Sequence, residues 1–185
     1  MARVEPFLLP VNGIVQPPVH PNPNRPGRRT NILDSLKTLL ADIWKQPWAF
    51  HFHHPVNAIT LGVPTYHKLI RRPMDLSTIK MRLNCNYYYQ ADEAIGDFKR
   101  IYENCLLFNP KGNVVHTAGL MLRSFFNERL AQIDLTNEVE VVEKPKTKTK
   151  RKKEPPEGSK PQTLAKKPLP GIKPSIDLPK HRKFD

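Results

Sequence analysis

The distribution of proline divides this chain into three parts. Seven of the 20 prolines lie in residues 1–30 and eight in residues 144–185, whereas only five lie in the stretch between. Proline removes a backbone hydrogen-bond donor and breaks the interior of a helix, and a segment without apolar periodicity cannot bury a core. We therefore expect a disordered Pro-rich tail over 1–30, one folded domain over 31–135 and a disordered basic Lys/Pro-rich tail over 136–185.

Charge follows the same division. Residues 31–143 hold 12 Lys or Arg against 12 Asp or Glu, so the net charge of +13 comes from the two ends. A polyanion such as DNA is therefore expected to contact the tails rather than the folded domain. The basic run Lys144–Lys153 predicts nuclear import or contact with DNA or RNA phosphates; the alternative is a solvated tail with no specific partner.

Several function classes find no support in the sequence. The two cysteines, Cys85 and Cys105, match no CxxC redox or zinc spacing, which favours a reducing compartment. No apolar run has the length of a membrane span, and a soluble intracellular protein is expected. His51, His53 and His54 could suggest a metal, but without spaced further ligands they are better explained as loop surface. No catalytic triad pattern or glycine-rich phosphate loop occurs, so we expect neither an enzyme nor a cofactor.

Apolar periodicity predicts four helices between the tails. The first is capped by Thr30 or Asn31 and stops near Pro47, and the second is capped by Asp75. The third ends before Pro110, and the fourth runs from Val115 to Ile133. Helices joined by one long and two short connections bury their apolar stripes against one another, so the fold class is all-α, an antiparallel four-helix bundle.

The long loop between the first and second helices, residues 48–72, is rich in aromatic and apolar residues. Such a loop cannot all face water, and long loops in compact domains are usually functional. We expect one helical turn at 66–70 and a site nearby. Tyr87, Tyr88 and Tyr89 could stack on nucleobases, but beside a helix end in a neutral domain they are expected to be packing residues.

Asn109 is the most informative single position. It ends the third helix, directly before Pro110, and its side-chain amide offers two N–H donors to a neutral carbonyl. The alternative is an asparagine that merely caps its own helix, which is common at helix ends.

The wider pattern resembles the bromodomain family, and most closely the first bromodomain of the BET (bromodomain and extraterminal) subgroup, over about residues 31–133. Because neither a second bromodomain nor an acidic extraterminal domain is seen, the chain resembles a short, single-bromodomain member. The motifs that carry the resemblance are Trp44-Lys45, Phe50-His51-Phe52, Pro55-Val56-Asn57-Ala58, Leu61, Val63-Pro64, Tyr66, Pro73-Met74-Asp75, Thr78-Ile79-Lys80, Arg82-Leu83, Asn86-Tyr87-Tyr88, Asp97-Phe98, Asn104-Cys105 and Asn109.

The resemblance implies a left-handed bundle with an acetyl-lysine pocket between the two loops at one end. Asn109 would donate to the acetyl carbonyl, and Tyr66 would hold that oxygen through a water. Phe50 and His51 would form an outer shelf. The residues that would line the pocket are Phe52, Val56, Leu61, Cys105, Phe108 and Val115.

Three positions depart from the family pattern. His51 replaces the proline of the usual Trp-Pro-Phe shelf, Phe108 replaces a tyrosine, and Val114 replaces an acid near the rim. They predict a shifted ligand preference and weaker attraction for basic histone residues. The sequence thus predicts a chromatin reader of acetylated lysine, with histone tails as partners, in transcription regulation in the nucleus. The alternative is a basic nucleic-acid-binding protein whose bundle serves packing or dimerisation.

Overall fold

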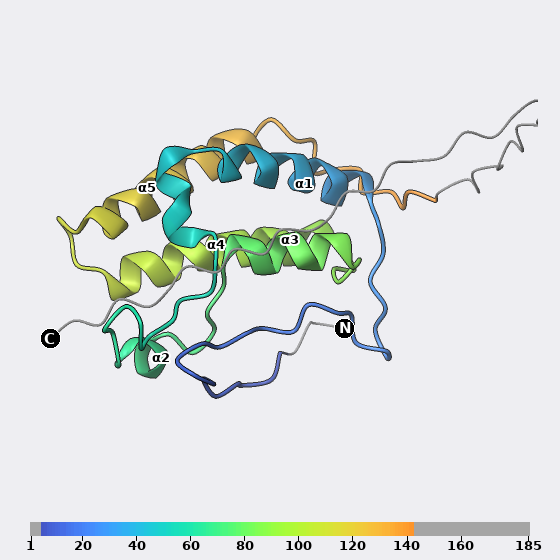
Figure 1. Cartoon of the computed structure of the whole chain (residues 1–185). Coiled ribbons are helices and arrows are strands. Elements are labelled where there is room, and N and C mark those ends of the chain that lie inside the picture. The colour runs from blue at the N-terminus through green and yellow to red at the C-terminus, as the bar shows by residue number, and fades with distance from the viewer. Residues whose placement is uncertain (1–4, 143–185) are drawn as a thin grey trace, which may run out of the picture. The chain divides into compact units, whose positions relative to one another are not determined.

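The computed structural model describes residues 5–142, which lie within one compact unit, and in this range it contains helices and no strand. Four helices form the predicted all-α bundle, and two shorter ones lie in the connection between its first and second helices (Figure 1). The elements are α1 Asn31–Trp44, the 3-10 helix η1 Pro47–Phe52, α2 Tyr66–Leu69, α3 Leu76–Asn84, α4 Ala91–Phe108 and α5 Val114–Leu130.

The helix starts follow the capping residues seen in the sequence. The Thr30 hydroxyl accepts a hydrogen bond from the Leu33 N–H (3.1 Å) at the start of α1. At the start of α3, Asp75 accepts from the Thr78 N–H (3.0 Å). Each bond satisfies a backbone donor that the first helical turn leaves without a partner.

The core consists of two clusters of apolar side chains. The larger one holds the buried stripes of α1, α3, α4 and α5 and includes Tyr87 and Tyr88, which confirms their predicted packing role. The same prediction was wrong for Tyr89, which is 46% exposed and lies outside the core. The smaller one, formed by Ala58, Tyr66 and Ile70, lies within the long loop. The helical turn expected at 66–70 is α2, and it carries this smaller cluster.

A buried ion pair inside the bundle was not predicted. Arg82 of α3 and Asp97 of α4 are both fully buried, and Arg82 Nη1 lies 2.5 Å from Asp97 Oδ2. The Tyr88 hydroxyl donates to the same carboxylate oxygen (2.8 Å), and Arg100 Nη1 lies 2.5 Å from Oδ1. The carboxylate of Asp97 thus joins α3 to α4.

The N-terminal segment differs from the expectation of a disordered tail. Residues 5–30 contain no helix, but they follow the bundle surface (Figure 1) with Val15 buried. The Gly13 carbonyl accepts from the Ala58 N–H (2.8 Å), and the Arg28 N–H donates to the Tyr88 carbonyl (2.9 Å). A Cβ at Gly27 would lie 1.8 Å from the Asn86 carbonyl oxygen, so the close approach here requires glycine. An extended proline-rich chain can therefore dock without a helix or strand of its own.

Residues 136–142, the described part of the expected disordered C-terminal tail, also contact the bundle. The Asn31 N–H donates to the Val139 carbonyl (3.1 Å), and the Val141 N–H donates to the Arg29 carbonyl (2.9 Å). The basic run Lys144–Lys153 lies outside the described residues. Within the described range, no helix combines the length and apolar character that crossing a membrane requires.

Candidate functional site

Asn109 lies at the C-terminal end of α4, in the extended conformation (φ −94°, ψ 128°) favoured before Pro110. Its side-chain Nδ2 donates to the Cys105 carbonyl (3.0 Å) and lies 3.7 Å from Cys105 Sγ. The structure therefore bears out the helix-capping contact. An amide nitrogen carries two hydrogens, so this one bond to the carbonyl does not exhaust its donor capacity.

The turn after Asn109 is fixed by contacts that the sequence analysis did not identify. Nδ1 of His116, in the first turn of α5, lies 2.8 Å from the Asn109 carbonyl oxygen. Since a carbonyl only accepts, Nδ1 carries the hydrogen in this contact. Asn113 caps α5 by accepting from the Val115 N–H (2.7 Å), and Gly112 takes a positive φ of 90°. No sequence motif singled out His116, because its partner is a backbone oxygen.

Tyr66 lies across from the end of α4. It is 7% exposed, and its ring packs edge-on against Phe108 with centroids 4.9 Å apart. Val56 packs against the same small cluster. Burial, with smaller contributions from the nearby Cys105 and Asp75, raises the pKa of the Tyr66 phenol well above its usual value. The hydroxyl therefore stays protonated and able to donate at any physiological pH.

Three more of the predicted pocket residues belong to the larger core. Phe52 and Cys105 are buried, and Val115 packs against the same core as a partly buried neighbour. Cys105 Sγ lies 3.1 Å from the Val115 carbonyl oxygen, which ties α4 to the start of α5. Burial raises the pKa of the Cys105 thiol to about 11, although hydrogen bonds from Asn109 and from the Gly119 backbone oppose the shift.

This raised pKa predicts slow chemical modification of Cys105. Relative to an ordinary thiol, a shift from 9.0 to about 11 lowers the reactive thiolate fraction about a hundredfold. Iodoacetamide at about pH 8 should therefore leave Cys105 unmodified in a Cys85→Ser variant, and modify it fully in urea. Its rate in the native protein should rise with pH up to the pKa. Peptide mass spectrometry measures both, and equal rates in native and unfolded protein would contradict the burial assigned here.

The remaining predicted residues are more exposed. Phe50 is 62% exposed, and His51 packs on it with ring centroids 3.8 Å apart, an arrangement compatible with the outer shelf, which stays a prediction. Burial lowers the pKa of His51, so its neutral form is favoured. Leu61 is 64% exposed and belongs to neither apolar cluster, so the structure does not bring it together with the other lining residues.

The histidines of the long loop form no metal centre in the part of the chain that the structure describes. No group of three or more His, Cys, Asp or Glu that could hold a metal ion occurs within residues 5–142. The His53 ring instead stacks on Trp44, with centroids 4.0 Å apart and planes within 6°. His53 therefore packs the long loop onto α1.

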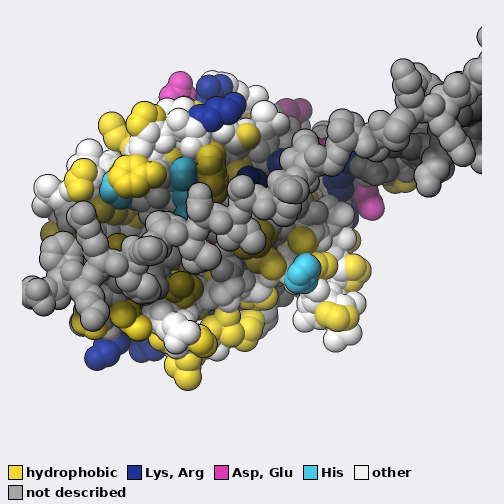
Figure 2. Space-filling model, viewed as in Figure 1, with side chains coloured by type: hydrophobic (Ala, Val, Ile, Leu, Met, Phe, Trp, Pro, Cys, Tyr) yellow, Lys and Arg dark blue, Asp and Glu magenta, His cyan; other side chains and the backbone are white. Residues whose placement is uncertain are grey.

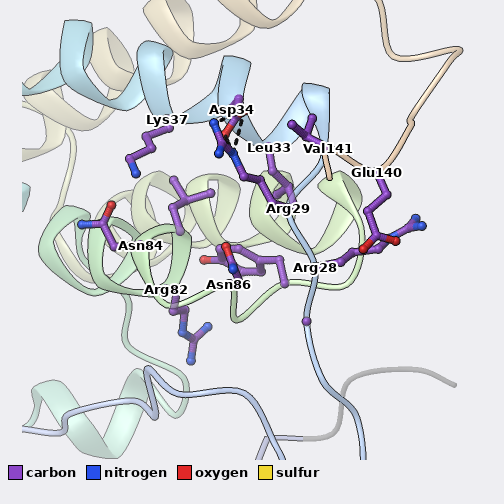
Figure 3. Close-up of a pocket in the computed structure, with 13 residues that line it drawn as sticks. Arg28, Arg29, Leu33, Asp34, Lys37, Arg82, Asn84, Asn86, Glu140 and Val141 are labelled. Carbon is purple, nitrogen blue, oxygen red and sulfur yellow. Dashed lines mark hydrogen bonds and ion pairs between the residues drawn. The ribbon is translucent and has the colours of Figure 1, made fainter. Parts of the chain in front are cut away.

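A polar cleft of about 550 Å³ lies near the start of α4, the opposite end from Asn109 (Figure 3). Arginine and lysine side chains gather around it, but Arg29 is paired with Asp34 (3.0 Å). Arg82 is paired with Asp97, as described above. Figure 3 shows Lys37 of α1 pointing toward Asn84 of α3. Much of the positive charge in this cleft is thus neutralised within the fold.

The bundle end at Asn109 presents one side-chain amide and one protonated phenol among apolar side chains. Such a set suits a small binding module for a neutral group that carries a carbonyl. A comparison with protein-family models matches residues 36–120 to the bromodomain family. The helical bundle is thus similar to a bromodomain, a family whose members are reader modules for acetylated lysine.

Proposed function

We propose that the chain is a nuclear reader of acetylated lysine on histone tails, acting in transcription regulation, and that its bromodomain is of the BET subgroup. The observation that carries the proposal is the Asn109 amide at the end of α4, next to Cys105 and adjoining the cluster of Tyr66 and Phe108. The motifs around Phe50-His51-Phe52 and Asn86-Tyr87-Tyr88 support the subgroup.

In this proposal the ligand is selected by its missing charge. An unmodified lysine carries an ammonium group whose desolvation is costly, whereas acetylation leaves a neutral amide and a methyl group. Asn109 donates to the acetyl carbonyl, and Tyr66 reaches the same oxygen through a water. Phe52, Val56, Cys105, Phe108 and Val115 surround the methyl group and the lysine stem, with Leu61 at the exposed rim.

The test compares acetylated and unmodified histone-tail peptides, titrated against the full chain by calorimetry. One net hydrogen bond contributes about 0.5 to 1.5 kcal/mol and each buried methylene about 0.8 kcal/mol, so binding per mark should be weak but saturable. The unmodified peptide should bind at least about tenfold more weakly. Equal binding of the two peptides would exclude recognition of acetyl-lysine and would indicate that the peptides bind through their charge alone.

The tail provides a second, separate activity. Residues 144–185 hold 14 Lys or Arg against four Asp or Glu, an excess that favours contact with DNA phosphates. The polar cleft near the start of α4 is a poorer candidate, because ion pairs within the fold occupy two of its arginines. We propose that the tail strengthens contact with chromatin while the bundle reads the mark.

Truncation after Glu143 should separate the two activities. We expect DNA affinity at low salt to fall by about tenfold or more, because the tail's cations displace counterions from DNA and this favourable release does not occur without the tail. The salt dependence of DNA binding should fall for the same reason. Affinity for the acetylated peptide should not change. Fluorescence anisotropy with a labelled duplex over a salt series measures the first, and calorimetry the second. Undiminished DNA binding by the truncated chain would locate the polyanion site in the bundle.

A further inference from the structure

A second cavity, separate from the bundle end at Asn109, lies between the N-terminal segment and the long loop. It has a volume of about 600 Å³, in the range of small-molecule sites. Its walls are mainly apolar and include Leu8 and Val15 on one side and Ala58 and Ile70 on the other. In Figure 2, apolar side chains crowd the lower surface of the molecule, the region where Figure 1 draws α2 and the N-terminal segment.

One polar group of this cavity has no partner within the described residues. His67 Nε2 lies 2.9 Å from the Gly13 carbonyl oxygen, whereas His67 Nδ1 is buried and makes no hydrogen bond to any of residues 5–142. Since the carbonyl only accepts, Nε2 carries the hydrogen. Nδ1 of the neutral ring is therefore an acceptor to which none of residues 5–142 donates. A group that donates, such as a hydroxyl, can pair with it, whereas a carboxylate oxygen only accepts.

The charges around the cavity are all of one sign. Lys68 and Arg71 contribute to its wall, and no Asp or Glu does. The Arg71 guanidinium lies 5.4 Å from the centre of the Phe7 ring, where a cation and an aromatic face attract each other. An apolar hollow with two cations at its wall complements a molecule that has an apolar body and one negative group.

We propose that this cavity binds a small amphipathic carboxylate, whose hydrocarbon part fills the apolar hollow and whose carboxylate lies between Lys68 and Arg71. A hollow of about 600 Å³ suits a single small molecule, whereas a protein partner needs a larger surface of about 800 Å² on each side. The N-terminal segment completes the site, because Gly13 fixes the His67 ring and Val15 closes one wall.

The test titrates dodecanoate, below its micelle concentration, into the full chain by calorimetry. We expect saturable binding, with dodecanol at least about tenfold weaker because it lacks the charge. The double variant Lys68→Gln/Arg71→Gln should weaken dodecanoate binding by about tenfold, since two partly exposed ion pairs are lost. A matched control, Lys99→Gln/Arg123→Gln, removes two exposed cations elsewhere and should leave the affinity unchanged.

Two further variants separate this site from the acetyl-lysine site. Ile59→Asp places a negative charge in the wall of the cavity, which repels the carboxylate of dodecanoate and should abolish its binding. Ile59 is 70% exposed, so the substitution should not unfold the domain. Asn109→Ala should leave dodecanoate binding intact. Loss of dodecanoate binding in Asn109→Ala, equal binding of dodecanol, or no saturable binding would each overturn the proposal. In the last case, an acidic peptide would be the next occupant to test.

Discussion

Replacing Asn109 by alanine should lower the affinity for an acetylated histone peptide by at least about tenfold, because the acetyl carbonyl is desolvated without a donor to pair it. The fold should survive. The Cys105 carbonyl that accepts from the Asn109 side chain also accepts from the Asn109 backbone N–H (3.0 Å), and alanine keeps that bond. Calorimetry measures the affinity, and urea unfolding measures the stability.

A second asparagine of α4 provides the matched control. The side-chain Nδ2 of Asn104 donates to the Arg72 carbonyl (2.9 Å), so Asn104→Ala also deletes one amide that is bonded to a backbone oxygen. We expect Asn104→Ala to retain peptide binding. Equal losses in the two variants would mean that Asn109 acts through helix capping alone. Asn109→Asp, which keeps the shape but replaces the donors by a charge, should bind no better than Asn109→Ala.

Local signals predicted most of the bundle. Thr30 and Asp75 start helices where their side chains can accept free backbone N–H groups, and Pro110 ends α4 by restricting the residue before it. The last helix starts at Val114, one residue before the prediction, and ends at Leu130 rather than Ile133. Periodicity alone does not define the end of a helix, because the apolar stripe continues into the turn after it.

Contacts between distant segments were not predictable in the same way. The path of residues 5–30 depends on backbone groups that meet the loop and the bundle, such as the Gly13 carbonyl and the Ala58 N–H. Composition describes side chains, and it predicted a tail because proline and glycine cannot continue a helix. It carries no information on which carbonyl reaches which N–H. The cavity beside His67 exists because of that path, so the sequence alone gave no hint of it.

For the candidate site, too, some residues were predicted and others were not. The resemblance identified Asn109, Tyr66 and Cys105, and the structure brings them to one end of the bundle through contacts along α4 and α2. It did not predict that Leu61 would be exposed or that His116 would hold the Asn109 carbonyl. Both depend on the local course of a loop or turn, and motif spacing does not determine that course.

Asp97→Ala should cause the largest loss of stability of any substitution considered, about 3 to 5 kcal/mol in the free energy of unfolding, because it leaves the buried Arg82 without its closest counter-charge. Arg82 is fully buried, and burial alone would lower the pKa of its guanidinium. The charge of Asp97 reverses this effect and raises the pKa above its usual value, with help from Tyr88 and Glu5. We expect the lower part of that range, because Glu5 Oε1 also lies 2.7 Å from Arg82 Nη2.

The size of this loss should depend on burial rather than on the removal of a carboxylate. Asp34 also pairs with an arginine, Arg29 (3.0 Å), but both side chains are more than a third exposed, at 37% and 40%. Water already solvates such a pair, so Asp34→Ala should cost less than about 1 kcal/mol. Urea unfolding of the two variants side by side measures the difference. If Asp97→Ala lost no more stability than Asp34→Ala, water or the existing contact with Glu5 would be enough to compensate the charge of Arg82, and the pair would not be what joins α3 to α4.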